Sequence, residues 1–208
     1  MKALRKTLAL FAALFFVGSG LALAQDTDHR FEIGGFVGYQ MGGRLETLAG
    51  RLNVKDSLNY GVTFDLAVRR GVRAEFSYTR QDADISLDTG AGDGAALFPA
   101  AVEYFQFGGV YERNLGRARP FGLASIGWMH INPKTTDVGS NSAFAAALGA
   151  GIKVFASDRI GFRFQARLLV PFLASGAEWF VGPGGGYVVA HGTTMLQFDL
   201  SAGIFLGF

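Results

Sequence analysis

Apolar residues alternate with small or polar residues, at a period of two, through most of this 208-residue chain. The last stretch shows the pattern well, because Phe198, Leu200 and Ala202 alternate with Asp199 and Ser201. Such alternation is typical of a β-strand whose two faces meet different surroundings. Eight segments carry it, at about 30–41, 57–69, 72–80, 101–113, 120–131, 143–155, 160–171 and 195–208. The sequence therefore predicts an all-β fold.

The connections between these segments alternate in length. They are short at 70–71, 114–119 and 156–158, and long at roughly 42–56, 81–100, 132–142 and 172–194. Short turns at one end and long loops at the other are typical of bacterial outer-membrane barrels, which have an even number of strands. We therefore expect an eight-stranded antiparallel up-and-down transmembrane β-barrel, with short periplasmic turns and long extracellular loops.

The chemistry of the two faces favours a membrane barrel over a soluble one. A soluble barrel has an apolar interior and a charged exterior, whereas only 17% of these residues are charged and 20 are phenylalanine. The polar face is mostly small and neutral, which suits a narrow interior. We also expect Tyr39, Tyr60, Tyr78 and Tyr104, all at the long-loop ends of strands, to form an interfacial aromatic girdle.

Two strand predictions leave alternatives open. In 101–113, Tyr104 and Phe105 cannot share a face unless the strand bulges, and Gly108–Gly109 is the candidate place for a bulge. In 143–155, the alanine run 145–147 could be helical, although the alternation around it favours a strand.

The amino terminus has the three-part pattern of a secretory signal peptide. Basic Lys2, Arg5 and Lys6 precede an apolar stretch and a small-residue cleavage site that ends at Ala24. We expect residues 1–24 to be removed and residues 25–208 to form the barrel; an amino-terminal membrane anchor is the alternative. Removal of the three basic residues changes the formal net charge from +2 to −1. The charge therefore gives no support for nucleic-acid binding.

Several segments of the second half resemble the outer-membrane β-barrel domain family, which includes small OmpA- and OmpW-type barrels. The segments are 104–111, 119–127, 147–153, 160–167 and 198–203. The resemblance covers roughly residues 100–208 well, and the first half by pattern alone. It implies a location in the outer membrane of a Gram-negative bacterium, contact with outer-membrane lipid and lipopolysaccharide, a monomer, and no cofactor. Many relatives have cysteines in the last long loop, whereas this chain has none.

The last strand resembles the terminal strand that the barrel-assembly machinery reads in outer-membrane proteins. The residues that carry this signal are Leu200, Ala202, Ile204, Leu206 and Phe208. We therefore expect the assembly machinery to be a partner during insertion.

Charged residues on the polar face are expected to project into the barrel. They are Glu32, Asp65, Arg69, Arg73, Glu75, Glu112, Lys153, Arg163, Arg167 and Asp199. Ionised groups away from water need partners, and an eight-stranded barrel is just wide enough for its own side chains. We therefore expect a polar network that plugs the interior, and a structural or cell-surface interaction role. The alternative is a narrow channel or a binding site for small hydrophobic molecules, as proposed for OmpW-type barrels.

The sequence gives no support for catalysis or metal binding. A Ser-His-acid site needs three converging side chains, and no local motif joins His29, His130 or His191 to a serine and an acid. No ligand spacing matches a metal site. The last long loop contains Trp179, Phe180 and Tyr187 as contact candidates. This loop could pack over the barrel mouth, extend the strands as a hairpin, or contact lipopolysaccharide or a protein partner.

Overall fold

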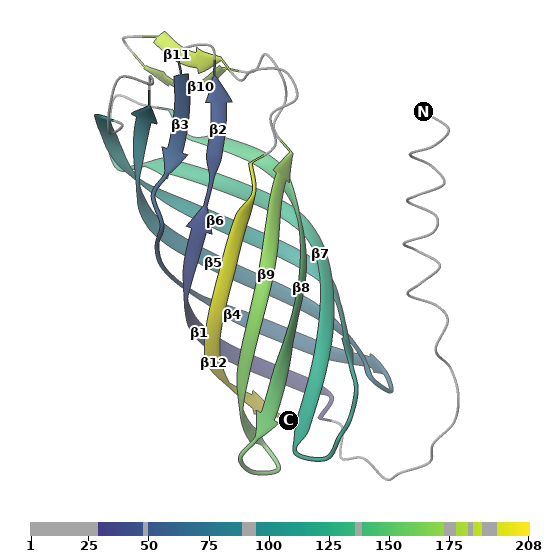
Figure 1. Cartoon of the computed structure of the whole chain (residues 1–208). Coiled ribbons are helices and arrows are strands. Elements are labelled where there is room, and N and C mark those ends of the chain that lie inside the picture. Colours follow the sequence, from purple (N-terminus) through teal and green to yellow (C-terminus); the bar gives the residue numbers. More distant parts are fainter. Residues whose placement is uncertain are drawn as a thin grey trace, which may run out of the picture.

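The structure, a computed structural model, describes residues 29–47, 50–88, 95–135, 139–172, 178–182, 185–188 and 195–208. Eight long strands of this part form the wall of a barrel (Figure 1). They are β1 (Phe31–Gly42), β4 (Ser57–Arg69), β5 (Val72–Asp88), β6 (Ala95–Glu112), β7 (Ala118–Pro133), β8 (Asn141–Phe155), β9 (Ile160–Phe172) and β12 (Gln197–Gly207). The described residues contain no helix that is long and apolar enough to cross a membrane.

The wall is closed, because every long strand pairs with its neighbour in the chain and β1 also pairs with β12. All of these pairings are antiparallel. The strands are staggered against one another. Starting at Phe31 of β1 and stepping each time to the directly opposed residue of the next strand, one returns to β1 at Met41, ten residues further along. This stagger tilts the strands against the barrel axis, by roughly 35–45° in barrels of this kind. The predicted fold class is confirmed.

Four short strands lie at the loop end. The hairpin of β2 (Arg44–Thr47) and β3 (Gly50–Val54) extends the wall, because β3 pairs with β5. Gly42 and Gly43 have φ angles of 82° and 109°, which lets the chain turn from β1 into β2. The hairpin of β10 (Glu178–Gly182) and β11 (Gly185–Val188) forms a separate sheet. Two of the expected long loops therefore contain short strands of their own, and most of a third, 81–100, belongs to the ends of β5 and β6.

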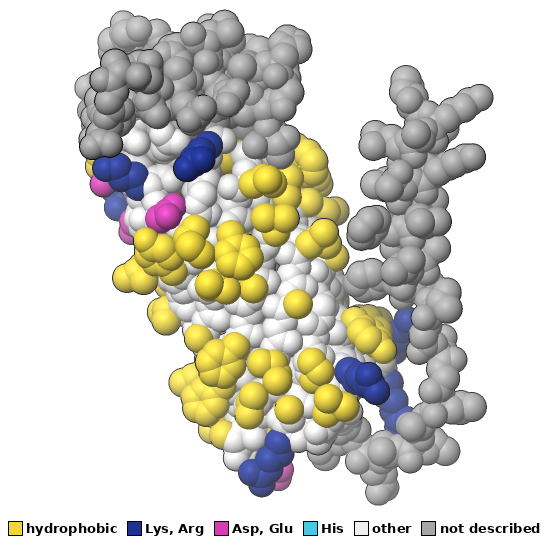
Figure 2. Space-filling view, viewed as in Figure 1, with side chains coloured by type: hydrophobic (Ala, Val, Ile, Leu, Met, Phe, Trp, Pro, Cys, Tyr) yellow, Lys and Arg dark blue, Asp and Glu magenta, His cyan; other side chains and the backbone are white. Residues whose placement is uncertain are grey.

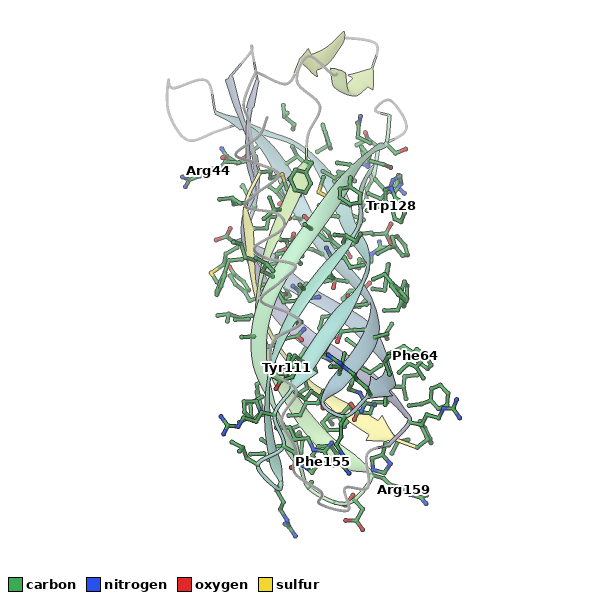
Figure 3. All side chains as sticks on the ribbon, turned by 90° about the vertical axis from the view of Figure 1, so that its right-hand side faces the viewer. Arg44, Phe64, Tyr111, Trp128, Phe155 and Arg159 are labelled. Atoms are coloured by element: carbon green, nitrogen blue, oxygen red, sulfur yellow. The ribbon has the colours of Figure 1, made fainter. Side chains whose placement is uncertain are left out.

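The outward face of the barrel is apolar over the middle of the wall (Figure 2). Trp128 near the loop end and Phe64 near the turn end both project away from it (Figure 3). A row of aromatic residues, each opposed to the next across neighbouring strands, runs over β5 to β9; it consists of Tyr78, Phe105, Trp128, Phe144 and Phe172. Aromatic rows of this kind mark the interface of a barrel with the bilayer.

Beyond this row, the outward and inward faces of the strands exchange their chemical character. On β5, Phe76 faces outward and Ser77 inward, but further along Asp82 and Asp84 are exposed and Ile85 is buried. An apolar exterior with a polar interior therefore gives way to a polar exterior with an apolar interior. The strand continues through this inversion, which is why β5 reaches Asp88 and does not end near residue 80.

The open alternative in the strand 101–113 is resolved, and the expected place of Tyr104 in the girdle was wrong. Pairing on both sides of β6 runs through Gly108 and Gly109 without a shift, so no bulge lies there. Tyr104 faces inward and is 1% exposed, while Phe105 faces outward. Tyr104 therefore belongs to the interior and not to the aromatic girdle. The open alternative in 143–155 is resolved, since β8 is a strand throughout.

Candidate functional site

A belt of buried charges fills the interior near the turn end. We call it the basal belt; its members are Glu32, Asp65, Arg73, Glu75, Glu112, Lys153 and Arg163. Lys153 lies at its centre and is fully buried. Its Nζ contacts Glu32 Oε2 at 2.6 Å, Asp65 Oδ2 at 3.1 Å and Glu112 Oε1 at 2.5 Å. One ammonium group thus joins β1, β4, β6 and β8 across the barrel.

Two arginines complete the basal belt. Arg163 Nη2 contacts Glu75 Oε2 at 2.6 Å, and Arg163 Nη1 contacts Asp65 Oδ2 at 3.4 Å. Arg73 Nη2 contacts Glu32 Oε1 at 3.3 Å and donates a hydrogen bond to the backbone oxygen of His29. Buried charges are tolerated when they are paired in this way. The charges of the basal belt are therefore both buried and paired at the turn end.

Phenylalanine rings pack between these cations and inward-facing glycines. Arg163 lies 4.7 Å from the ring centre of Phe121, within the range of a cation–π contact. Phe121 is paired directly with Gly151, and a Cβ on this glycine would lie 2.5 Å from the ring. Phe36 and Phe205 are paired in the same way with Gly61 and Gly161. The absence of a side chain on each glycine makes room for the ring.

A second polar group lies nearer the loop end. Arg167 Nε contacts Asp199 Oδ1 at 3.0 Å, and Arg167 Nη2 donates to Thr79 Oγ1 at 3.0 Å. Beyond them, buried amides form a hydrogen-bonded cluster, which we call the amide cluster: Gln40, Asn59, Gln81 and Gln197. Tyr104 donates to Gln197 Oε1 of this cluster.

Apolar side chains face the interior at the loop end, and we call them the apolar layer. Its larger members are Val54, Ile85, Phe98, Val102, Met129, Ile131, Leu169 and Met195, and its smaller members are Ala83, Ala100, Ala143, Ala145 and Ala147. Tyr104 packs against this layer and its hydroxyl lies 3.3 Å from Met129 Sδ. The interior thus changes from charged to amide to apolar along the barrel.

A family model for the outer membrane protein beta-barrel domain matches residues 9–172, which is more than half of the chain. The chain belongs to this family. Membership supports the outer membrane as its location.

Solved structures of outer-membrane barrels are similar to this outer-membrane barrel. Neisserial surface protein A superposes with a TM-score of 0.58 at 10% identity, over 86% of this chain and 97% of that one. AlkL, whose structure was determined in lipid bilayers, superposes with a TM-score of 0.55 at 11% identity, over 92% of this chain and 97% of that one. OprG from Pseudomonas aeruginosa superposes with a TM-score of 0.53 at 12% identity, over 86% of this chain and 95% of that one. These likenesses show the shared fold. No curated protein matches the sequence.

Nine of the ten charged residues expected inside this outer-membrane barrel are buried. The prediction for Arg69 was wrong: it is exposed, because the pairing of β4 with β5 shifts between Ala67 and Arg69 next to the turn. Sequence reasoning missed Arg119, which is 6% exposed and lies 4.5 Å from the ring centre of Phe155. Arg119 of β7 is paired with Lys153 of β8, and this pairing with an inward residue could have revealed that Arg119 also faces inward.

The terminal-strand residues all lie on the outward face. These residues, Leu200, Ala202, Ile204, Leu206 and Phe208, are exposed. Trp179, Phe180 and Tyr187 lie in the β10–β11 hairpin, where only the backbone is described, and Trp179 is opposed to Tyr187. Residues 1–24 of the expected signal peptide lie outside the described residues.

The two described histidines, His29 and His130, lie far apart, one at the turn end and one on the outward face. His130 Nδ1 lies 2.7 Å from Ser142 Oγ, on the outward face of β7 and β8. His29 contacts the backbone oxygen of Asp158 at the turn end. His191 and Ser175 lie outside the described residues. In the described part of the chain, no group of three or more histidines or acids could hold a metal ion.

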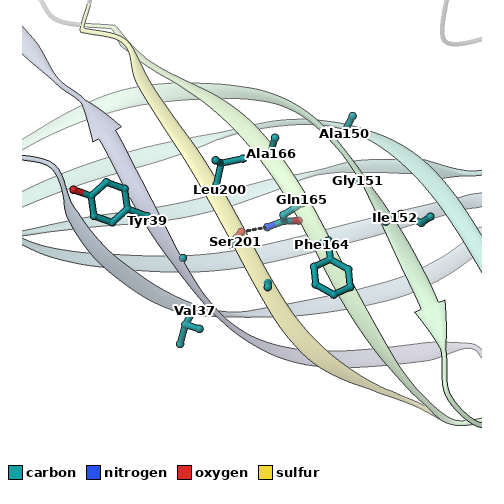
Figure 4. A pocket seen from close by; sticks show the side chains of 12 residues that line it. Val37, Tyr39, Ala150, Gly151, Ile152, Phe164, Gln165, Ala166, Leu200 and Ser201 are labelled. Atoms are coloured by element: carbon teal, nitrogen blue, oxygen red, sulfur yellow. Dashed lines mark hydrogen bonds between the residues drawn. The ribbon is translucent and has the colours of Figure 1, made fainter.

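A hollow of about 610 Å³ lies on the outside of the wall, over β1, β8, β9 and β12 (Figure 4). Small outward residues, Ala150, Ala166 and Ala202, line it between the larger Tyr39 and Phe164. Beneath it, Gln165 Nε2 donates to Ser201 Oγ at 3.1 Å inside the barrel. The hollow therefore lies mainly on the outward apolar face.

Proposed function

We propose that this protein is a non-conducting outer-membrane barrel that acts at the cell surface through its loop end. The observation that carries the proposal is the basal belt, in which Lys153 contacts three carboxylates and is fully buried. A solute that crossed the barrel would have to break these contacts and leave charges unpaired in a low-dielectric interior, which costs several kcal/mol per ion.

Conductance in planar bilayers tests this proposal. We expect the purified barrel to give no large, stable single-channel currents. Large, stable currents from the folded protein would refute it. Heat-modifiable mobility on gels would verify that the sample is folded.

A second function is favoured by the apolar layer. We propose that the loop end of the interior binds small apolar molecules. Among the described strands, β12 begins low in the wall: its first residue, Gln197, is paired with Leu169 of β9, whereas β9 continues to Phe172 and is paired there with Phe144 of β8. Next to this low wall, Met195 is buried and Leu196 is exposed. An apolar molecule could thus pass between the bilayer and the apolar layer without entering the basal belt.

Binding of decane to the barrel in lipid nanodiscs tests this second function. We expect decane to change the methyl NMR signals of Met129 and Met195, which lie in the apolar layer. Unchanged signals at saturating decane would refute it.

Catalysis has no place in either proposal. His130 and Ser142 pair on the outward face, 2.7 Å apart. The expected result is that overexpression leaves the mass of lipid A unchanged, and a lost or gained acyl chain would contradict this.

A further inference from the structure

The amide cluster contains polar atoms that lack a partner. Among the described residues, Asn59 Oδ1, Gln81 Oε1 and Gln197 Nε2 are buried side-chain atoms without a hydrogen bond. The three side chains are at most 1% exposed. Buried polar groups almost always have a hydrogen-bond partner, and one that is left unsatisfied costs free energy. The unsatisfied atoms therefore point to a polar group that binds there.

The three residues that carry the unsatisfied atoms are all hydrogen-bonded to Gln40. Gln81 Nε2 lies 3.4 Å from the backbone oxygen of Gln40, and Gln40 Nε2 donates to Gln197 Oε1 at 2.9 Å. Gln197 Oε1 also accepts from Tyr104, so the Gln197 amide is held with its Nε2 free. The cluster thus presents two acceptors, Asn59 Oδ1 and Gln81 Oε1, and one donor, Gln197 Nε2.

The same atoms lie at the border of the apolar layer. Gln197 Nε2 and Val54 Cβ lie 2.9 and 3.0 Å from the position that a Cβ on Gly43 would occupy, so the amide is next to a member of that layer. Tyr104 bonds to Gln197 and packs in the layer. A ligand whose polar head reached the amide cluster would therefore have its tail among apolar side chains.

The nearby charges are already paired. Asp199 accepts from Arg167 at 3.0 Å, from Ser201 at 3.1 Å and also from Asn59. A carboxylate head could not satisfy Gln81 Oε1, and an ammonium head could not accept from Gln197 Nε2. Either charged head would also be buried without a counter-charge. A hydroxyl or a primary amide can both donate and accept.

We propose that the loop end of the interior binds a single-chain amphiphile with a neutral head that donates and accepts hydrogen bonds, such as an alcohol or a primary amide. The head lies on the amide cluster and the chain lies in the apolar layer. This inference rests on the proposed binding of apolar molecules and adds the chemical class of the ligand.

The experiment compares four ten-carbon probes in lipid nanodiscs: decane, decanol, decanoate and decyltrimethylammonium. The readout is the side-chain amide NMR signals of the glutamines together with the methyl signals of Met129 and Met195. We expect decanol to shift the amide signals of Gln81 and Gln197 and to bind about tenfold more tightly than decane. The two charged probes should bind no more tightly than decane.

Three variants separate the head site from the chain site. Q81L should lower the affinity for decanol to that for decane and leave decane binding unchanged. Thr63→Val, which changes a buried inward residue outside the amide cluster, is the matched control and should change neither affinity. Ala145→Leu, which places a larger side chain in the apolar layer, should lower the affinities for both decane and decanol. Heat-modifiable mobility shows that each variant is folded.

The outcomes distinguish the inference from the function on which it rests. If decane binds but decanol binds no more tightly, or if decanoate binds as tightly as decanol, the head site is refuted and only water satisfies the amides. If neither decane nor decanol binds, the proposed binding of apolar molecules fails, and the inference fails with it.

Discussion

Replacement of Lys153 by methionine removes the central charge of the basal belt and keeps a long, unbranched side chain in its place. The Nζ of Lys153 contacts three carboxylates at 2.5 to 3.1 Å. At an effective dielectric constant of about 20, a pair of unit charges at about 3 Å attracts by roughly 5 kcal/mol. Desolvation of the buried ions offsets most of this gain. Removal of one partner from a buried ion pair costs about 3–5 kcal/mol, because the remaining charge is unpaired.

We therefore expect K153M to lower the free energy of unfolding by about 3–5 kcal/mol. The assay is reversible urea unfolding of the barrel in lipid vesicles. With an m-value of roughly 2 kcal/mol per molar urea, the midpoint should fall by about 2 M. The double variant K153M/E112Q, which also removes one of the unpaired carboxylates, should recover part of this loss.

The control is Arg117→Met, which removes a positive charge from an exposed turn. Its midpoint should stay close to that of the wild type, because surface substitutions usually change stability by less than about 0.5 kcal/mol. An unchanged midpoint for K153M would refute the reasoning, and so would equal losses in K153M and Arg117→Met.

Three further substitutions test other parts of the structure by the same unfolding assay. Gly151→Ala should destabilise the barrel by about 1–3 kcal/mol, because its Cβ would lie 2.5 Å from Phe121; Gly35→Ala, where nothing lies within 4 Å, should have little effect, and equal losses would contradict the packing argument. Leu148→Arg on the outward face should cost about 2–4 kcal/mol if this face meets the bilayer, and a neutral result would argue against that. Glu103→Gln removes the negative charge that faces Arg80 near the rim and should cost less than about 1 kcal/mol.

Much of the fold could be predicted because successive residues of a strand face opposite sides, so that the surroundings of each residue follow from its position in the alternation. Within the membrane band, every second residue meets the bilayer, so the alternation is written locally in each strand. The limits of β4 and β9 agree with the predicted segments to within a residue. The inward charges could be predicted for the same reason. The exposed position of Arg69 could not be predicted, because a shift in pairing at the end of the strand interrupts the alternation.

The apolar layer could not be predicted from the alternation. Beyond Arg80, the outward residues of β5 meet water and the inward ones pack together, so the pattern inverts in the middle of a strand. The inversion makes residues 81–88 look like a polar loop. Tyr104 and Phe105 are both aromatic, and either could face the bilayer. Only the pairing with the two neighbouring strands, which opposes Tyr104 to Thr79 and Met129, decides that Tyr104 faces inward.

The sequence by itself determined an all-β transmembrane barrel with eight strands and the inward position of most of its charges, since both follow from a period of two along a single strand. The tertiary structure alone decided which charges meet, because the contacts of Lys153 come from β1, β4 and β6, up to 121 residues away in the chain. It also decided that amides with unsatisfied atoms lie against an apolar layer. That arrangement depends on the stagger between strands, which no single strand encodes.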